Sequence, residues 1–301
     1  MKLVISASPH IDSGATTRKI MGDVLIALCP ALIAAIVIFG WRALLVTAVC
    51  AAACVFFEWG FEWLCHKEST IGDLSAVVTG VILAYNLPVS IPLWQAVFGA
   101  LVAMVAVKGL FGGLGKNFAN PAIVARIVLF LAFSSSMTAW VYPDAVSSAT
   151  PLAMLAKGEH VDYLTLLLGH HGGCIGETCA LALLLGFAYL LIRRVVTWQT
   201  PVCFVGMVFL LSLILGQDAL AQVLSGGLLL GAIFMATDYS TSPCTAWGKV
   251  LFGIGAGLLT VLIRFYGAYA EGVSFAILFM NILTPYLTRW TRTKPLGGAK
   301  A

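Results

Sequence analysis

VLIALCPALIAAIVIF, residues 24–39, is an unbroken apolar run, and its length decides the fold class of this chain. Such a run excludes an outer-membrane barrel, whose strands alternate in hydropathy over about ten residues. Of the 301 residues, 60% are hydrophobic and 10% are charged, and mean hydropathy is +1.00. Soluble domains carry about 25% charged residues. The sequence therefore predicts an all-α integral membrane protein.

The number of membrane crossings follows from helix length, because a helix needs about 20 apolar residues to span the hydrocarbon. On this criterion we expect ten transmembrane helices, at residues 22–40, 43–64, 71–88, 92–109, 122–140, 176–193, 200–216, 222–237, 248–266 and 270–288. We expect one membrane domain over residues 1–301.

The basic residues predict the orientation. If the N-terminus is cytoplasmic, every Lys and Arg falls on the cytoplasmic side except Arg42, Lys157 and Arg264. This bias follows the positive-inside rule. Both termini are then cytoplasmic, and the long loop at about 141–175 is external. Because the basic residues are scattered over short loops and form no stripe, we expect no nucleic-acid partner.

Ten spans divide into two inverted five-helix repeats, one at about 20–140 and the other at about 176–290. Residues 69–88 (STIGDLSAVVTGVILAYNLP) and 221–243 (AQVLSGGLLLGAIFMATDYSTSP) resemble one another, with a Leu-Ser start, Gly-spaced apolar residues, a polar end and a proline. Short Gly-interrupted spans at matching positions of two halves predict a binding site near the membrane midplane. The alternative is that these glycines only allow tight helix packing.

Two cytoplasmic loops carry candidate binding residues. GGLGKNFANPA, 112–122, looks like a phosphate-binding loop but fails that pattern at Leu110 and at Asn117. Asn117 and Asn120 are candidates for binding a cofactor, with a purely structural turn as the alternative. ATDYSTSP, 236–243, supplies Thr237 and Asp238. A carboxylate beside hydrocarbon is costly, so we expect Asp238 to line a wet cavity or to contact a cofactor or cation.

The second predicted span holds another carboxylate pair. Glu58 and Glu62 are four residues apart and share one helix face. They mark either an ion path or an interfacial position, and the neighbouring Trp59 and Trp63 favour the interface.

The order of four motifs resembles that of the RnfD/NqrB family over essentially the whole chain. The motifs are SPH at 8–10, GGLGKNFANPA at 112–122, DAVSSATPL at 144–152 and ATD…P at 236–243. The resemblance implies a membrane flavoprotein subunit of an Rnf ferredoxin:NAD oxidoreductase complex or of a Na⁺-translocating NADH:quinone oxidoreductase. The short N-terminus and the loop sequence look more like RnfD. The family carries FMN in phosphoester linkage to a threonine in D-x-x-[ST]-[GS]-A-T, installed from FAD by a separate flavin transferase.

Carried over to this sequence, the pattern makes Thr150 the acceptor. The matching residues are Asp144, Ser147, Ser148 and Ala149, with serine at 148 where glycine is commoner. From the residues alone, Thr150 is expected to be a helix N-cap, with proline in the first turn and Gly158 past the end.

A second copy of the motif core lies at 13–16, Ser-Gly-Ala-Thr. It lacks the upstream aspartate at the required spacing, since Asp12 directly precedes Ser13. Thr16 is also predicted to be cytoplasmic, whereas the resemblance implies an extracytoplasmic transferase. We therefore expect FMN on Thr150 and not on Thr16.

The function predicted from the resemblance is that of an Rnf-type subunit in the cytoplasmic (inner) membrane. It would carry electrons on covalent FMN, couple ferredoxin/NAD electron transfer to Na⁺ or H⁺ transport, and be catalytically incomplete alone. Expected partners are the other membrane and peripheral subunits of such a complex, which contain flavins and iron–sulfur clusters. A noncovalent riboflavin near the cytoplasmic loops is a further expectation. No metal site and no catalytic side chain is expected. The alternatives are an NqrB-type subunit and an inverted-repeat solute transporter without a redox role.

Overall fold

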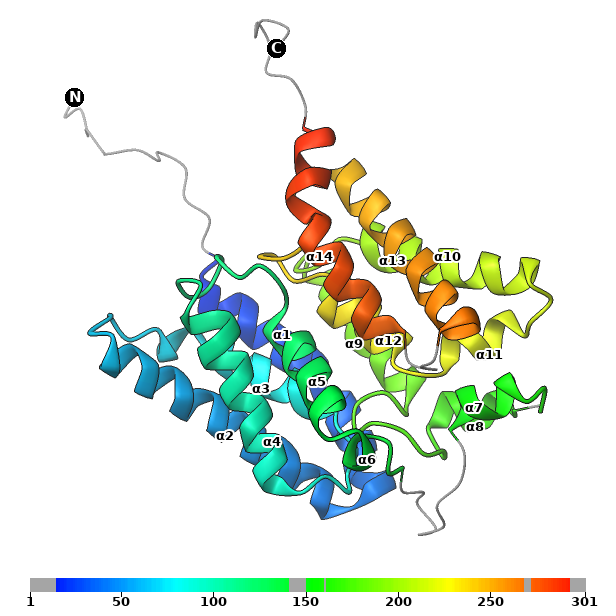
Figure 1. Cartoon of the computed structure of the whole chain (residues 1–301), viewed down its shortest axis with the longest axis horizontal. Helices are drawn as coiled ribbons and strands as arrows, with labels where there is room; N and C mark the ends of the chain where they lie inside the picture. The colour runs from blue at the N-terminus through cyan, green and yellow to red at the C-terminus, as the bar shows by residue number, and fades with distance from the viewer. Residues whose placement is uncertain (1–14, 141–149, 160, 268–271, 293–301) are drawn as a thin grey trace, which may run out of the picture.

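All regular structure in the described residues is helical (Figure 1). The computed structural model describes residues 15–140, 150–159, 161–267 and 272–292. Within these ranges three helices, α1, α2 and α13, are each long and apolar enough to cross a membrane. Five further apolar helices have 10–17 residues. The prediction of an all-helical membrane protein is confirmed.

The first half of the chain contains the helices α1 to α6. They are α1 (Thr17–Phe39), α2 (Trp41–Leu64), the short 3₁₀ turn η1 (Ile71–Asp73), α3 (Ser75–Tyr85), α4 (Leu93–Leu101), which continues as the π-helix η2 (Val102–Gly109), α5 (Pro121–Ala132) and α6 (Ser134–Met137). Two spans differ from the prediction. The helix expected over 71–88 is interrupted at Leu74, which has a φ of +66°, and ends at Tyr85, and the helix expected over 122–140 ends at Ala132. The backbone leaves helical geometry at Phe133 (φ −132°), just before three serines, whose side chains compete for backbone hydrogen bonds.

The rest of the chain contains two short loop helices, α7 and α8, and a second group of helices that begins with α9. They are α7 (Pro151–Ala156), α8 (Tyr163–Leu168), α9 (Ala180–Ile192), α10 (Gln199–Ile214), α11 (Ala219–Leu224), α12 (Leu228–Leu230), the π-helix η3 (Gly231–Met235), α13 (Ala246–Tyr266) and α14 (Val273–Trp290). The single helix expected over 222–237 was wrong. Gly226 and Gly227 have φ angles of +66° and +62°, a left-handed conformation that glycine adopts readily, and they separate α11 from α12.

The two groups of helices pack against each other through helices that hold the same position in each group. The first long helices, α1 and α9, are in contact, and so are the last ones, α5 and α14 (Figure 1). The third helix of the first group, α3, begins after Leu74 in the left-handed region, and α12 begins after Gly227 in the same region. This correspondence agrees with the similarity of the two sequence segments that contain these helices.

Glycines allow several of these helices to approach closely. A Cβ atom at Gly80 in α3 would lie 2.6 Å from the Ala51 Cα atom of α2. A Cβ atom at Gly186 in α9 would lie 2.3 Å from the Ala27 carbonyl oxygen of α1. Small residues at helix crossings are typical of membrane bundles. Tight packing is therefore one role of these glycines, beside the break at Gly226 and Gly227.

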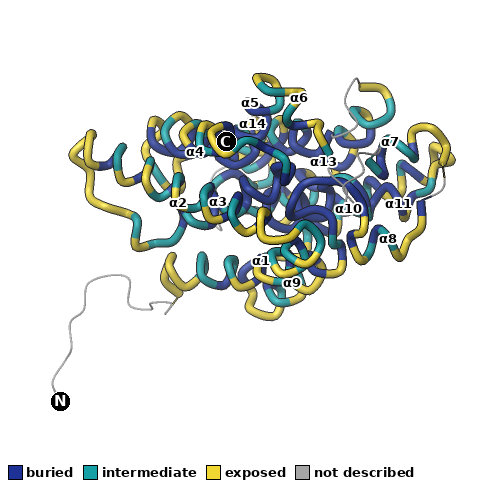
Figure 2. Tube along the Cα trace, turned by 90° about the horizontal axis from the view of Figure 1, so that it is seen from below, coloured by how far each residue is buried: buried dark blue, intermediate teal, exposed yellow. Residues whose placement is uncertain are grey.

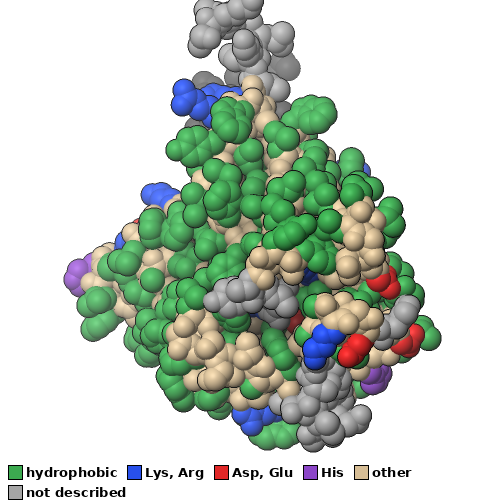
Figure 3. Space-filling view, turned by 45° about the vertical axis from the view of Figure 1, so that its right-hand side comes forward, with side chains coloured by type: hydrophobic (Ala, Val, Ile, Leu, Met, Phe, Trp, Pro, Cys, Tyr) green, Lys and Arg blue, Asp and Glu red, His purple; other side chains and the backbone are tan. Residues whose placement is uncertain are grey.

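The outer surface of the bundle is apolar. Buried residues lie along the middle of the bundle (Figure 2), and large hydrophobic side chains such as Val37, Leu210 and Ile214 point outward. Hydrophobic side chains also cover most of the face drawn in Figure 3, and many of the charged ones lie near its edges. This distribution is the one expected of a surface that faces lipid.

Candidate functional site

The loop predicted to carry the attachment site is described only from Thr150 onward. Asp144, Ser147, Ser148 and Ala149 lie outside the described residues. Thr150 is the N-cap of α7, and its Oγ1 atom accepts a hydrogen bond from the Ala153 backbone N–H (3.4 Å). Pro151 occupies the first helical position, and Gly158 follows the helix at φ +78°. The predicted cap, proline and terminal glycine are confirmed.

Thr150 is chemically available as an attachment point. Its side chain is partly exposed, and its oxygen acts as an acceptor in the cap. The Thr150 hydroxyl donates no hydrogen bond to the described residues. Forming a phosphoester at its oxygen would therefore break no such bond. Thr16 has similar local geometry, since it caps α1 and accepts from the Lys19 backbone N–H (3.3 Å). Local structure therefore does not distinguish the two threonines.

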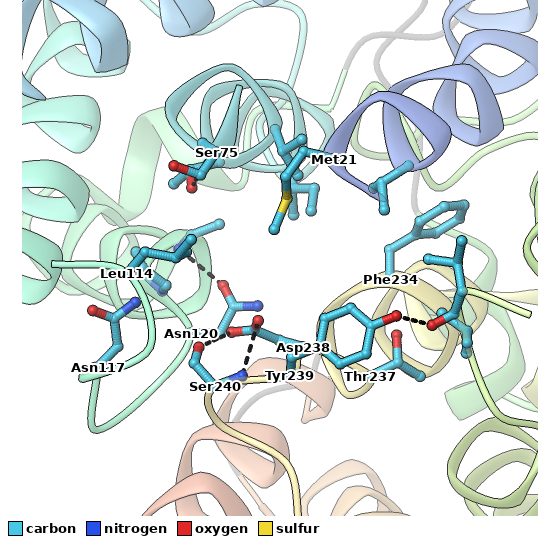
Figure 4. A pocket seen from close by; sticks show the side chains of 18 of the residues that line it. Met21, Ser75, Leu114, Asn117, Asn120, Phe234, Thr237, Asp238, Tyr239 and Ser240 are labelled. Atoms are coloured by element: carbon cyan, nitrogen blue, oxygen red, sulfur yellow. Dashed lines mark hydrogen bonds between the residues drawn. The ribbon is translucent and has the colours of Figure 1, made fainter. Parts of the chain in front are cut away.

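Four loop residues singled out in the sequence line one cavity. Asn117 and Asn120 come from the loop before α5, and Thr237 and Asp238 come from the loop after η3 (Figure 4). The cavity has a volume of about 80 Å³, below the range of about 300–1,000 Å³ typical of small-ligand pockets, and it is partly open to the outside. Apolar residues supply most of the remaining wall, among them Met21, Val78, Ile82, Leu190, Ile233 and Phe234.

Hydrogen bonds to the protein hold three of these polar residues in place. Asn120 is the N-cap of α5, where its Oδ1 atom accepts from the Ala122 backbone N–H (3.0 Å) and its Nδ2 atom donates to the Met235 carbonyl (3.3 Å). Thr237 Oγ1 donates to the Ile233 carbonyl (2.6 Å). Asn120 thus connects the start of α5 to the end of η3. The structural-turn role and the cavity position coexist in this residue.

Asp238 is held by hydroxyl groups of its own loop. Its Oδ2 atom accepts from Ser240 Oγ (2.9 Å) and from Thr241 Oγ1 (3.1 Å). Burial raises the pKa of Asp238 above its ordinary value, and the hydrogen bonds from Ser240 and Thr241 partly oppose that shift. The next residue, Tyr239, closes the wall by donating its hydroxyl to the Val195 carbonyl.

Asn117 differs from its neighbours because it has a buried oxygen without a partner. Its Oδ1 atom accepts no hydrogen bond, although the residue is only 8% exposed. A buried polar atom without a partner is costly, and such atoms in native structures require an explanation. A ligand with a hydrogen-bond donor at the cavity wall would satisfy this oxygen. The cavity wall is thus mainly apolar, with a few polar groups that a ligand could contact.

Sequence reasoning missed an ion pair beside the cavity. Lys108, at the end of η2, lines the cavity, forms a salt bridge with Glu58 and donates to Ser75 Oγ (2.6 Å). Glu62 accepts from the Thr70 backbone N–H (3.1 Å). Both glutamates are buried within the bundle, and the choice between an ion path and an interfacial position stays a prediction. Sequence analysis missed the pair because Lys108 and Glu58 are 50 residues apart and lie on different helices.

A second buried polar group lies where the two halves meet. Arg126 Nη1 donates to Asn86 Oδ1 (3.2 Å) and to Ser274 Oγ (2.8 Å), and Nη2 lies 3.7 Å from Cys174 Sγ. Asn86 Nδ2 in turn lies 3.3 Å from Met235 Sδ. The end of α3 and the end of η3 are therefore joined by polar contacts. An arginine within an apolar span is the only sequence signal that could have indicated this group.

The fold and these sites define a class: an all-helical membrane protein with broken inner helices, an inner cavity and a threonine that caps a short loop helix. The chain belongs to the NQR2, RnfD, RnfE family, whose model matches residues 4–297. The resemblance stated from the motifs is thereby confirmed at the level of the family.

Curated relatives cover the whole chain, and each is the D component of its complex. The chain is 44% identical to that of the Na(+)-translocating ferredoxin:NAD(+) oxidoreductase complex of Acetobacterium woodii, over 100% of this chain and 97% of the relative. It is 37% identical to that of the proton-translocating ferredoxin:NAD(+) oxidoreductase complex of Clostridium ljungdahlii, over 97% and 96%. It is 31% identical to that of the ion-translocating oxidoreductase complex of Escherichia coli, over 98% and 99%. All three relatives thus belong to ion-translocating oxidoreductase complexes.

Proposed function

We propose that this chain is the membrane flavoprotein subunit of an Rnf-type, ion-translocating ferredoxin:NAD oxidoreductase complex. In this proposal FMN is joined to Thr150 by a phosphoester bond. A flavin transferase forms the bond between the Thr150 oxygen and phosphorus, breaks the pyrophosphate bond of FAD and releases AMP. The observation that carries the proposal is the family's threonine motif ending at a partly exposed helix cap, in a chain related to such subunits over its full length.

The finer topology belongs to the same proposal. We infer ten crossings as two inverted repeats in the cytoplasmic membrane, with both termini cytoplasmic and Thr150 external. The pairings of α1 with α9 and of α5 with α14 support the repeats, and the distribution of basic residues supports the orientation. Reporter fusions after residues 116 and 158 test the orientation, since only the second should report an external position.

We propose that the second, noncovalent flavin binds at the inner cavity, whose walls must move apart to admit the ring, because the cavity volume of about 80 Å³ is smaller than a flavin. A bound flavin accepts and releases one or two electrons, with its electronics set by the surrounding protein. Asn117 would bind a polar edge of the ring, and the apolar wall would exclude water. Partners of this chain would include flavin- and iron–sulfur-containing subunits, because the described residues contain no group that could deliver electrons to either flavin.

Flavin fluorescence in a denaturing gel tests the covalent site. The chain is produced with its transferase and compared with Thr150→Val and Thr16→Val. We expect a fluorescent band for the wild type and for Thr16→Val, and a dark band for Thr150→Val. A dark wild-type band would favour the solute-transporter alternative, which the inverted repeat also allows.

Extraction of noncovalent flavin tests the inner cavity. In the Thr150→Val background, Asn117→Leu is expected to lower the flavin released on denaturation. Gln95→Leu is the matched control, because Gln95 is also a buried amide with an unpartnered oxygen but does not line the cavity. Equal flavin content in the two variants would show that Asn117 does not contact the flavin.

A further inference from the structure

Buried side chains join the helix that carries Thr150 to the rest of the bundle, and Leu152 is the one that meets the break between α11 and α12. Leu152 is two residues beyond the cap and is 6% exposed. Its Cδ1 atom fills the space beside Gly226, where a Cβ atom would lie only 2.0 Å away. Gly226 therefore has two reasons to be glycine: its φ of +66° and the presence of Leu152. The contact occurs at the break between α11 and α12.

Arg264 fixes the conformation of this break. From the last turn of α13, its Nη1 atom donates to the Gln222 carbonyl (2.7 Å) and its Nη2 atom donates to the Ser225 and Gly226 carbonyls (both 3.1 Å). These carbonyls lie in the last turn of α11 or just beyond it, where no continuing helix supplies donors. The guanidinium thus makes the break a defined turn, and Leu152 packs on a fixed surface.

A small apolar cluster holds the two loop helices on α11. It consists of Leu155, Val161, Leu166 and Ala221, with Met154 and Leu224 packed against it. Tyr163 adds a hydrogen bond from its hydroxyl to Asp218 Oδ2 (2.7 Å), and Asp218 caps α11. The attachment helix α7 is therefore part of an ordered external unit.

The same broken segment, residues 219–238, reaches the inner cavity at its other end. The Met235 carbonyl accepts from Asn120, and Thr237 and Asp238 line the cavity wall. One continuous piece of chain thus contacts the attachment helix at its outer end and the cavity at its inner end.

We propose that the broken segment (residues 219–238) sets the separation between the external attachment site and the inner cavity, with Leu152 as the positioning residue. The functional part of this inference rests on the proposed function. Without the Leu152 contact, α7 would still be capped by Thr150 and held on α11 by the cluster around Leu155, but it would lose its contact with the fixed turn at Gly226 and be less firmly positioned. The attached flavin would then sample a range of distances from the cavity.

Hydrogen–deuterium exchange of residues 150–158 tests the contact without any flavin. The full chain is purified from cells lacking the transferase, as wild type, Leu152→Ala, Gly226→Ala and the double variant. Gly226→Ala is expected to speed exchange in α7 at least about fivefold, since forced overpacking is destabilising. The double variant should exchange more slowly than Gly226→Ala alone, because Leu152→Ala removes the clash. Leu168→Ala, on exposed α8 surface, is the matched control and should leave α7 unchanged.

Fluorescence anisotropy of the attached flavin tests the positioning role. In cells with the transferase, Leu152→Ala should give a fluorescent gel band as bright as that of the wild type but a lower flavin anisotropy. Leu168→Ala should change neither. Two results would overturn the inference. One is a double variant whose exchange equals the sum of the two single effects, and the other is an unchanged flavin anisotropy in Leu152→Ala. A wild-type chain without flavin would refute the proposed function alone, because the exchange experiment would still measure the contact.

Discussion

Replacing Lys108 with methionine should destabilise the protein by an amount that depends on pH. Lys108 and Glu58 are 3% and 5% exposed, and they form a salt bridge between η2 and α2. Methionine is similar in length, so the substitution removes the charge and leaves little empty volume. Glu58 is then buried without its cation, and breaking a buried pair in this way costs about 3–5 kcal/mol.

The cost has an upper bound, because the carboxyl group can take up a proton. From the reference pKa of glutamate in water, about 4.3, holding the group neutral at pH 7 costs about 3.7 kcal/mol. The same calculation gives about 2.3 kcal/mol at pH 6, since each unit of pH corresponds to about 1.4 kcal/mol. The stability lost by Lys108→Met should therefore shrink as the pH falls.

Thermal unfolding of the purified chain in detergent provides the assay. At roughly 2–4 °C per kcal/mol, Lys108→Met should lower the Tm by roughly 7–15 °C at pH 7, and by less at pH 6 when each value is compared with wild type at the same pH. The double variant Glu58→Gln/Lys108→Met is the control and should recover most of the loss. A Tm loss that is equal at both pH values, or a double variant no more stable than Lys108→Met, would refute this account of the pair.

Two further predictions concern Thr150 and the packing of Gly176 against the bundle. Thr150→Asn should keep α7 capped, because asparagine is a good N-cap, but should give a dark gel band. Thr150→Val should give a dark band and should also speed amide exchange in α7 about fivefold, because it removes a cap that contributes about 1 kcal/mol. A fluorescent Thr150→Asn band would show that FMN is attached to another residue. Gly176→Ala should lower the Tm by several degrees, because its Cβ atom would lie 2.3 Å from Tyr85, and overpacking costs about 1–3 kcal/mol. Gly60→Ala meets no atom within 4 Å and should leave the Tm unchanged or raise it, so equal losses in the two glycine variants would contradict the packing argument.

The sequence by itself determined the features that depend on residues close together in the chain. Apolar runs indicated the helices, and the order of four motifs indicated the family. The Thr-Pro-…-Gly pattern indicated the cap at Thr150, because an N-cap bonds to a backbone N–H only three residues away. The sequence allowed the break within the segment 222–237 but did not predict it, since two adjacent glycines permit a left-handed turn without requiring one.

Only the tertiary structure decided which distant residues share a site. Asn117 and Asp238 lie more than a hundred positions apart, yet packing places both at the same cavity. Lys108 joins Glu58, and Leu152 meets Gly226, for the same reason. Hydropathy and capping are local properties that the sequence records directly. A contact between two helices depends instead on the crossing geometry, which the side chains of the whole bundle set together.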